Sequence, residues 1–298
     1  MQGAILLLPC RPAIAENHNS AVRKCRPFPL GQIAMKRVVF NQKGGVGKST
    51  ITCNLAAIAA ARGKRTLVVD LDPQANSTRY LLGAAAESLE STVTEFFDQM
   101  LNFKLRPKAT DDFIHATPFE NLYLMPADAA LEELQAKLES RYKIYKLKEA
   151  LEALDFEQIW IDTPPALHFY TRSALIAADS CLIPFDCDEF ARRALYTLLD
   201  NVAEIRADHN PVLAVEGIVV NQFQSRASLP QQVVQELRDE GLPVLDPFLS
   251  ASVKIKESHQ QAKPMVHLDA RHKLTDEFTR LFDALERARQ PARQKKRA

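Results

Sequence analysis

Two lysines and three glycines within one short loop are the residues of this chain best suited to chemistry. Residues 43–50 read Lys-Gly-Gly-Val-Gly-Lys-Ser-Thr. Glycines allow backbone N–H groups to converge on phosphate oxygens, and Lys48 adds a positive charge. Ser49 can offer its hydroxyl to Mg²⁺, and a helix that begins here directs its N-terminus at the anion. The pattern predicts a phosphate loop that binds a nucleotide through Gly44, Gly45, Val46, Gly47, Lys48, Ser49 and Thr50.

Lys43 is the unusual residue of this loop. One triphosphate rarely needs two lysines from the same loop, and Lys48 already stands where the phosphate-binding lysine is expected. Lys43 is therefore expected to serve a phosphate that is bound by another subunit.

Three carboxylates follow apolar runs that have the composition of buried strands. Asp70 and Asp72 end Val68-Val69-Asp70-Leu71-Asp72, and Asp162 ends Ile159-Trp160-Ile161-Asp162. At the carboxyl edge of a sheet these side chains would project toward the phosphate loop. One of the first two is expected to support the Mg²⁺ shell and the other to orient an attacking water, while Asp162 is expected to hold the metal through water. The alternative is that they are simply polar strand ends.

Asn221 ends a further apolar run, Val219-Val220-Asn221. A side-chain amide can match the hydrogen-bonding edge of adenine, so Asn221 is a candidate for base binding, although an asparagine commonly ends a strand without any such role. No Asn-Lys-x-Asp segment that would read guanine occurs, which disfavours GTP.

Bulk properties exclude several classes of protein. The chain has 298 residues, 46% of them hydrophobic, and a net charge of +1. Residues 287–298 hold six basic side chains and no acidic one, which leaves −5 for residues 1–286. The five cysteines form no Cys-x-x-Cys pair, which favours a reducing, cytoplasmic compartment without a disulfide framework. No apolar run is long enough to span a membrane, and the histidine spacing suggests no metal site beyond Mg²⁺.

Apolar runs alternate with helical patterns from Lys36 to about Arg289, which predicts an α/β P-loop fold with a mostly parallel, doubly wound sheet flanked by helices. Residues 1–34 are expected to be a disordered or non-native extension, 35–289 the ATPase domain and 290–298 a basic tail. The predicted strands are 36–40, 65–70, 121–125, 158–162, 180–185, 214–220 and 243–245. The predicted helices are 49–62, 129–153, 171–178, 189–207, 229–240 and 273–289. Residues 84–118 are expected to form short helices.

The motifs together resemble the ParA family of partitioning ATPases, within the deviant-Walker group that includes MinD. The resemblance covers about residues 36–286 and is carried by the segments 41–50, 70–78, 162–165, 174–179, 183–185 and 257–264. It implies a dimer that encloses ATP and Mg²⁺, in which Lys43 reaches the partner subunit's phosphates. It also implies that Lys48 binds the β- and γ-phosphates, Ser49 binds Mg²⁺, Asp72 orients the attacking water and Asp162 holds the metal through water.

The same resemblance implies that the ATP-bound dimer binds DNA without sequence preference and that a ParB-like partner stimulates hydrolysis. Arg226, Lys254 and Lys256 match the neighbourhood of the DNA-contacting positions. We therefore expect a cytoplasmic, nucleoid-associated homodimer that positions DNA or another large cargo.

The alternative is a MinD-like ATPase whose terminal helix binds a membrane. Leu274, Phe278, Leu281, Phe282 and Leu285 have helical spacing and could face lipid or the protein core. Acidic residues in the same helix, among them Asp276 and Asp283, disfavour anionic lipid, so a membrane partner is not expected.

Overall fold

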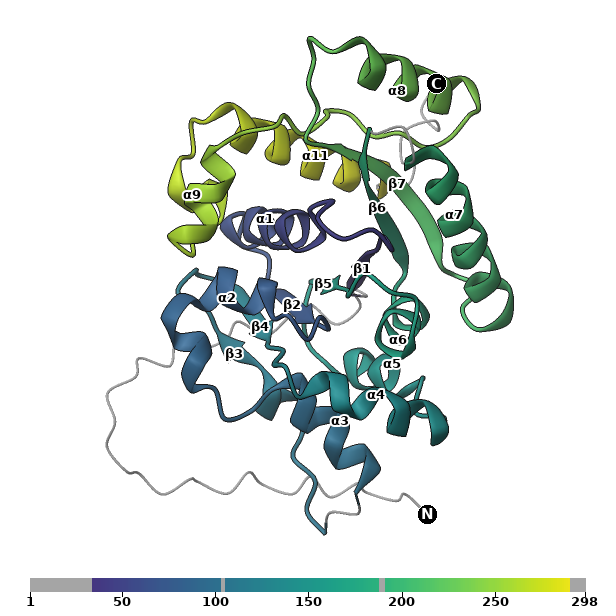
Figure 1. The fold of residues 1–298 in the computed structure, drawn as a ribbon. Coiled ribbons are helices and arrows are strands. Elements are labelled where there is room, and N and C mark those ends of the chain that lie inside the picture. Colours follow the sequence, from purple (N-terminus) through teal and green to yellow (C-terminus); the bar gives the residue numbers. More distant parts are fainter. Residues whose placement is uncertain (1–33, 103–104, 188–190, 290–298) are drawn as a thin grey trace, which may run out of the picture. The chain divides into compact units, whose positions relative to one another are not determined.

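The computed structural model describes residues 34–102, 105–187 and 191–289. These residues form a seven-stranded sheet with the strand order β3-β4-β2-β5-β1-β6-β7 (Figure 1). All neighbouring strands are parallel except β3 and β4. The strands are β1 (Met35–Val39), β2 (Thr66–Asp70), β3 (His115–Ala116), β4 (Leu122–Met125), β5 (Gln158–Asp162), β6 (Ser180–Asp186) and β7 (Ala214–Asn221).

Helices cover both faces of the sheet, because its central strands are apolar on both sides. The α-helices are α1 (Lys48–Ala61), α2 (Asn76–Leu82), α3 (Val93–Leu101), α4 (Leu131–Ser140), α5 (Lys146–Glu152), α6 (Phe169–Ala177), α7 (Ala191–Asp208), α8 (Ser228–Asp239), α9 (Lys254–Gln260), α10 (Met265–Leu268) and α11 (Lys273–Arg289). Two 3₁₀ helices, η1 (Gly83–Ser88) and η2 (Thr110–Phe113), complete the described elements.

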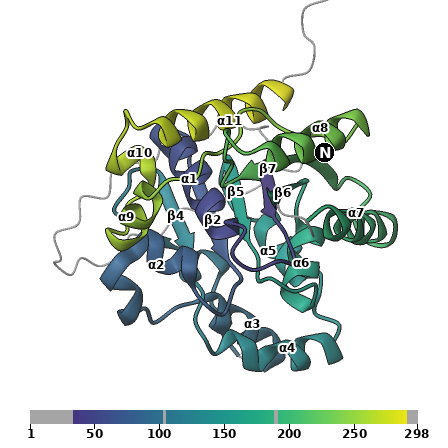
Figure 2. The ribbon, with the colours of Figure 1, turned by 45° about the horizontal axis from the view of Figure 1, so that its top comes forward.

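Successive residues of a strand point to opposite faces, and here they enter two separate cores. Val38 of β1 lies in a core shared with α3 to α8, whereas Val39 lies in a core shared with α1, α2, α10 and α11. Figure 2 shows α1 and α11 together on one side of the sheet. The predicted mostly parallel, doubly wound sheet is confirmed.

The last helix, α11, is docked on the second of these cores. Its apolar residues are Leu274, Phe278, Leu281, Phe282 and Leu285, and all five are buried against the core that includes α1. The amphipathic pattern of this helix is therefore satisfied within the protein. In the part of the chain that the structure describes, no helix is long and apolar enough to cross a membrane.

Several boundaries differ from those predicted from the sequence. The predicted helix 129–153 is two helices, α4 and α5, separated at Tyr142, whose φ of 53° is left-handed. The predicted strand 243–245 is reduced to an isolated bridge between Val244 and Ile218. Pro243 is its first residue and Pro247 follows it closely, and prolines lack the N–H that a strand ladder needs.

The short elements α2, α9 and α10 were not predicted, because four to seven residues are too few to show a helical period. Short helices do occur within residues 84–118, as expected. The predicted extension 1–34, apart from Ala34, and the basic tail 290–298 lie outside the described residues.

Candidate nucleotide and magnesium site

The phosphate loop connects β1 to α1 at the carboxyl edge of the sheet. Gly45 and Gly47 have φ values of 78° and 93°, which are unfavourable for residues that carry a side chain. Gly47 directly precedes the first turn of α1. Lys48 Nζ donates to the carbonyl of Lys43 at 3.2 Å and so closes the loop on itself. Lys43 is exposed, whereas Lys48 is buried. The two lysines thus occupy different environments, one inside the loop and one at its rim.

Asn221 braces the phosphate loop from β7. Its Nδ2 donates to the carbonyl of Val46 at 2.9 Å, and Gln222 Nε2 donates to the carbonyl of Gly45 at 3.3 Å. Asn221 also lines a second hollow, together with Gln222 and with Val253 of the loop before α9. Base binding by Asn221 stays a prediction, and the structure adds a contact that holds the loop in shape.

The strand-end carboxylates meet at the same edge. Asp70 of β2 and Asp162 of β5 are register partners on adjacent strands, and both are fully buried. Asp70 accepts from Thr78 N and Thr78 Oγ1, each at 2.8 Å, and from Asp72 N at 3.1 Å. Asp162 Oδ2 accepts from Ser77 Oγ at 2.7 Å. Two residues in the first turn of α2, Ser77 and Thr78, therefore hold two of the three carboxylates.

Burial changes the protonation of this cluster. It raises the pKa of Asp70 above its usual range, and the charge of Asp162 raises it further. Burial also raises the pKa of Asp162, while the nearby hydroxyls of Ser49 and Ser77 lower it. The pKa of Lys48 is lowered by burial and raised by Asp162 and Asp72. Carboxylates packed this closely favour a cation between them and the phosphate loop.

These residues fit Mg²⁺. Within the described ranges, no group of three His, Cys, Asp or Glu side chains forms a metal cage, which suits an ion that is bound mainly by phosphates and water. Asp162 Oδ1 is buried, and no residue in the described part of the chain forms a hydrogen bond with it. A carboxylate oxygen in that position needs a donor or a cation. Ser49 and Asp162 are thus the residues that would hold a hydrated Mg²⁺, which polarises the phosphate oxygens when bound.

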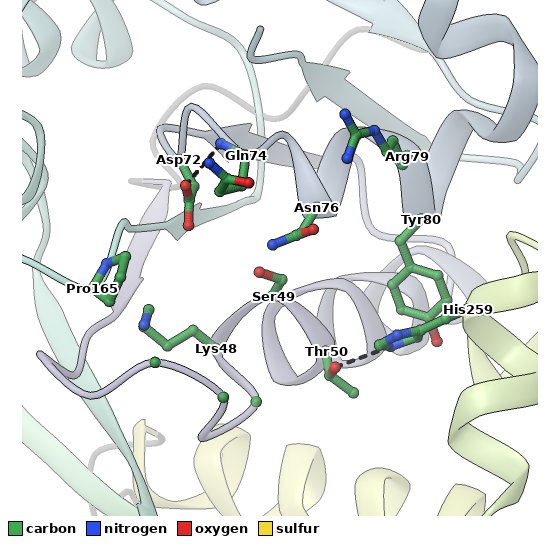
Figure 3. Close-up of a pocket in the computed structure, with 13 residues that line it drawn as sticks. Lys48, Ser49, Thr50, Asp72, Gln74, Asn76, Arg79, Tyr80, Pro165 and His259 are labelled. Atoms are coloured by element: carbon green, nitrogen blue, oxygen red, sulfur yellow. Dashed lines mark hydrogen bonds between the residues drawn. The ribbon is translucent and has the colours of Figure 1, made fainter. Parts of the chain in front are cut away.

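A cavity of about 510 Å³ lies in front of the loop. Lys48, Ser49 and Asp72 face the same space in Figure 3. Asp72 is 6% exposed, and its Oδ1 accepts from Gln74 N at 2.9 Å, so this carboxylate is held at the wall of the cavity. The remaining wall includes residues to which the sequence assigned no role, namely Asn76, Arg79, Tyr80, Pro165 and His259.

The predicted DNA contacts lie on the segment after β7 and in the first turn of α9. Arg226 follows β7, and Lys254 and Lys256 begin α9. A bridge between Phe223 and Ser250 places the segment after β7 beside the segment before α9. Arg226 and Lys256 are exposed, whereas Lys254 forms an ion pair with Glu257 at 2.7 Å.

The strand–loop–helix unit, its lysine and the carboxylates on adjacent strand ends define a P-loop ATPase. A family model described as an AAA domain matches residues 35–215. The chain is 33% identical over 247 residues to the chromosome partitioning protein ParA of Myxococcus xanthus, covering 82% of this chain and 84% of that protein. It is 35% identical over 240 residues to the sporulation initiation inhibitor protein Soj of Bacillus subtilis, covering 78% and 90%. The chain belongs to the ParA family.

A solved structure is also similar. The cobyrinic acid a,c-diamide synthase of Mycobacterium smegmatis, crystallised with ADP and magnesium, has a TM-score of 0.72 and 29% identity, covering 85% of this chain and 94% of that one. The predicted family and the prediction of an ATP hydrolase are confirmed. The predicted cofactors, ATP and Mg²⁺, agree with this neighbour. The roles of individual site residues stay predictions.

Proposed function

We propose that this protein is a Mg²⁺-dependent ATPase that dimerises on ATP and positions DNA or another large cargo through non-specific DNA binding. Lys48 and Ser49 bind the phosphates and Mg²⁺, Asp162 holds the metal through water, and Asp72 orients the attacking water. Asp70 supports the coordination shell of Mg²⁺ from the buried side of the site. Relatives named as partitioning proteins support this choice of cargo.

The observation that carries the proposal is the separation of the two loop lysines. Lys48 is buried and lines the cavity, whereas Lys43 is exposed and directly precedes Gly44, which also lines the cavity. The Lys43 backbone is held by two contacts, because its N–H donates to Asn41 Oδ1 at 2.8 Å and its carbonyl accepts from Lys48. An exposed cation on a loop whose backbone is held in this way is suited to a phosphate that belongs to a facing subunit.

DNA binding follows from the same dimer. Arg226 and Lys256 are two exposed cations per subunit, and Lys254 is partly neutralised by Glu257. So few cations bind phosphate weakly, but two subunits double the number of contacts, and linked contacts add to the affinity. We therefore assign the ATP-bound dimer to the nucleoid in the cytoplasm, where a ParB-like partner would stimulate hydrolysis and release it.

The test is a DNA-shift titration with ATP, with ADP and without nucleotide, at two salt concentrations. Binding is expected only with ATP and is expected to weaken steeply as salt rises. Reversing Lys254 and Lys256 to Glu is expected to abolish the shift while sparing ATP binding. Reversing Lys137, which is exposed on α4 away from these residues, is the matched control. Equal binding in all three nucleotide states would contradict an ATP switch.

The membrane alternative has less support. A lipid-binding terminal helix needs a free apolar face, but the apolar residues of α11 are buried against the core that contains α1. Absence of any DNA shift, together with binding to anionic vesicles, would favour this alternative.

A further inference from the structure

His259 of α9 contacts Thr50, the last residue of the predicted phosphate loop, and both residues line the cavity. Its Nε2 lies 3.0 Å from Oγ1 of Thr50, although the two residues are 209 positions apart in the sequence. Figure 3 shows the two side chains joined beside the ring of Tyr80. The Tyr80 and His259 rings have centroids 4.4 Å apart, so the imidazole is packed as well as hydrogen-bonded. This contact belongs to the nucleotide cavity, yet the predicted phosphate loop does not account for it.

The direction of this hydrogen bond determines what Thr50 can do. A hydroxyl has one proton to donate and two lone pairs that accept. If Thr50 donates its proton to His259, nothing remains to donate to a phosphate oxygen. If His259 donates from Nε2, the hydroxyl proton of Thr50 is free to point at the phosphate. Only the second arrangement serves a nucleotide.

We propose that His259 is a positioning residue that donates its Nε2–H to Thr50 Oγ1, so that the Thr50 hydroxyl donates to a phosphate oxygen of the bound nucleotide. This inference rests on the proposed nucleotide-binding role of Thr50. His259 itself touches no reacting atom. It fixes the direction of a donor that would otherwise rotate, and so contributes to nucleotide affinity rather than to the chemical step.

The surrounding contacts hold His259 in place. Tyr80 OH and Ser258 Oγ are 2.5 Å apart, and Asn54 Nδ2 donates to Tyr80 OH at 3.1 Å. Asn54 also contacts one partner of the proposed pair, because its Nδ2 donates to the Thr50 carbonyl at 2.8 Å, and its Oδ1 accepts from Met265 N of α10 at 2.8 Å. Helices α1, α2, α9 and α10 are therefore tied together around the Thr50–His259 contact.

The charges near His259 agree with a neutral donor. His259 is an exposed residue, and the partial burial of its ring lowers its pKa, which favours the neutral ring near pH 7. The other ionisable groups that line the two hollows beside His259 are Lys48, Asp72, Arg79, Tyr80, Glu87 and Asp128. A neutral imidazole with the proton on Nε2 satisfies the donor requirement without adding a charge.

The test is a double-mutant cycle on the affinity for Mg²⁺-ADP, measured by calorimetry on the full chain. T50V removes the hydroxyl and keeps the shape, and H259F removes the donor and keeps the ring on Tyr80. Each is expected to weaken binding by about fivefold to tenfold, the effect of one hydrogen bond. The double variant is expected to be no weaker than either single variant, because the two changes remove the same interaction.

Rescue separates positioning from packing. H259Q places an amide N–H at nearly the reach of Nε2 and is expected to bind within about twofold of the parent chain. Melting temperatures of all variants without nucleotide check that they are folded. Additive losses in the cycle, or equal losses in H259Q and H259F, would overturn the inference. If the parent chain itself fails to bind Mg²⁺-ADP, both the nucleotide site and the inference are wrong, whereas tight binding by H259F overturns the inference alone.

Discussion

At the scale of single residues, the site consists of buried carboxylates whose positions are set by hydroxyls. Ser77 donates to Asp162 and Thr78 donates to Asp70, and Thr78 Oγ1 in turn accepts from Ala127 N at 3.0 Å. These bonds take up one oxygen of Asp162, and its Oδ1 has no hydrogen-bond partner among the described residues. A buried, unpaired carboxylate oxygen is costly in the absence of a cation and would be stabilised by binding one.

Lys48 and Asp72 should separate binding from turnover. Lys48→Ala removes the buried phosphate cation and is expected to lower ATP affinity by at least about tenfold. Asp72→Ala is expected to retain ATP affinity within about threefold but to lose hydrolysis, because a group that only orients water adds little ground-state binding. Calorimetry and phosphate release measure the two effects. Unchanged hydrolysis in Asp72→Ala would move the catalytic role elsewhere.

In the absence of nucleotide and Mg²⁺, Asp162 is expected to lower the free energy of unfolding as the pH rises. Its folded pKa is raised, so the folded state holds the proton more strongly than the unfolded state, and stability falls as pH rises through the folded pKa. Asp162→Asn is expected to be about 1 kcal/mol more stable at pH 8 without Mg²⁺, with a flatter pH profile. It should also lose the stabilisation by Mg²⁺-ADP. Denaturant melts at pH 5, 6.5 and 8 test this. A parent-like Mg²⁺-ADP effect would exclude Asp162 from the metal site.

At the scale of elements, the residues at strand ends were predictable from the sequence, whereas contacts between segments far apart in the sequence were not. Asp70, Asp162 and Asn221 end apolar runs, so local pattern alone brings them to one sheet edge. The hydroxyls of Ser77 and Thr78 stand in the segment that carried the family resemblance, but their bonds to carboxylates depend on the turn of the backbone into α2, where Ala75 has a φ of 52°. The contact of His259 with Thr50 needs α9 to fold back over α1, and no local pattern encodes that path.

Gly47 is expected to be irreplaceable where β1 passes into α1. A Cβ at Gly47 would lie 2.3 Å from Asn221 Nδ2, and φ is 93° there. Gly47→Ala is expected to abolish ATP binding because Asn221 and the loop must move apart. Gly63→Ala is the matched control, since its φ is 81° but nothing lies within 4 Å of the added Cβ. It should cost only backbone strain of about 1–2 kcal/mol and keep ATP binding. Calorimetry with denaturant melts distinguishes the two.

Glu286 should tie α11 to the sheet in a pH-dependent way. Arg37 of β1 is fully buried, binds Glu216 through two hydrogen bonds at 2.8 and 2.9 Å, and donates to Glu286 at 3.3 Å. Burial raises the pKa of Glu286, but the hydrogen bond from Lys64 and the charge of Arg37 outweigh it and leave the pKa lowered.

A carboxyl group whose pKa is lowered in the folded state stabilises the fold at pH values above its ordinary pKa. That stabilisation is lost as the pH falls through the folded pKa. Glu286→Gln is expected to cost about 1–2 kcal/mol at pH 7. The difference from the parent chain should shrink below about pH 4.5. A difference that is independent of pH from 7 to 3.5 would show that the charge of Glu286 plays no part.

At the scale of the whole molecule, the account depends on two subunits meeting across the nucleotide. Lys43 is exposed beside the loop that lines the cavity, and the proposed DNA contacts of one subunit are few. Both features agree with the proposed dimer. The fold, the ATPase class and the family are shown by the sheet topology and by relatives of 33% and 35% identity. In the proposed function, ATP-dependent dimerisation is the step that connects ATP hydrolysis with cargo positioning.

The most direct test measures the molar mass of Asp72→Ala by light scattering after chromatography, with Mg²⁺-ATP, with Mg²⁺-ADP and without nucleotide. This variant is expected to bind ATP without consuming it, so its mass should double only with ATP. Adding Lys43→Gln should restore the monomer while leaving ATP binding within about threefold, because in the proposed dimer Lys43 reaches the partner subunit's phosphates and not its own. A monomer in all three conditions, or an ATP-dependent dimer that survives Lys43→Gln, would contradict the account.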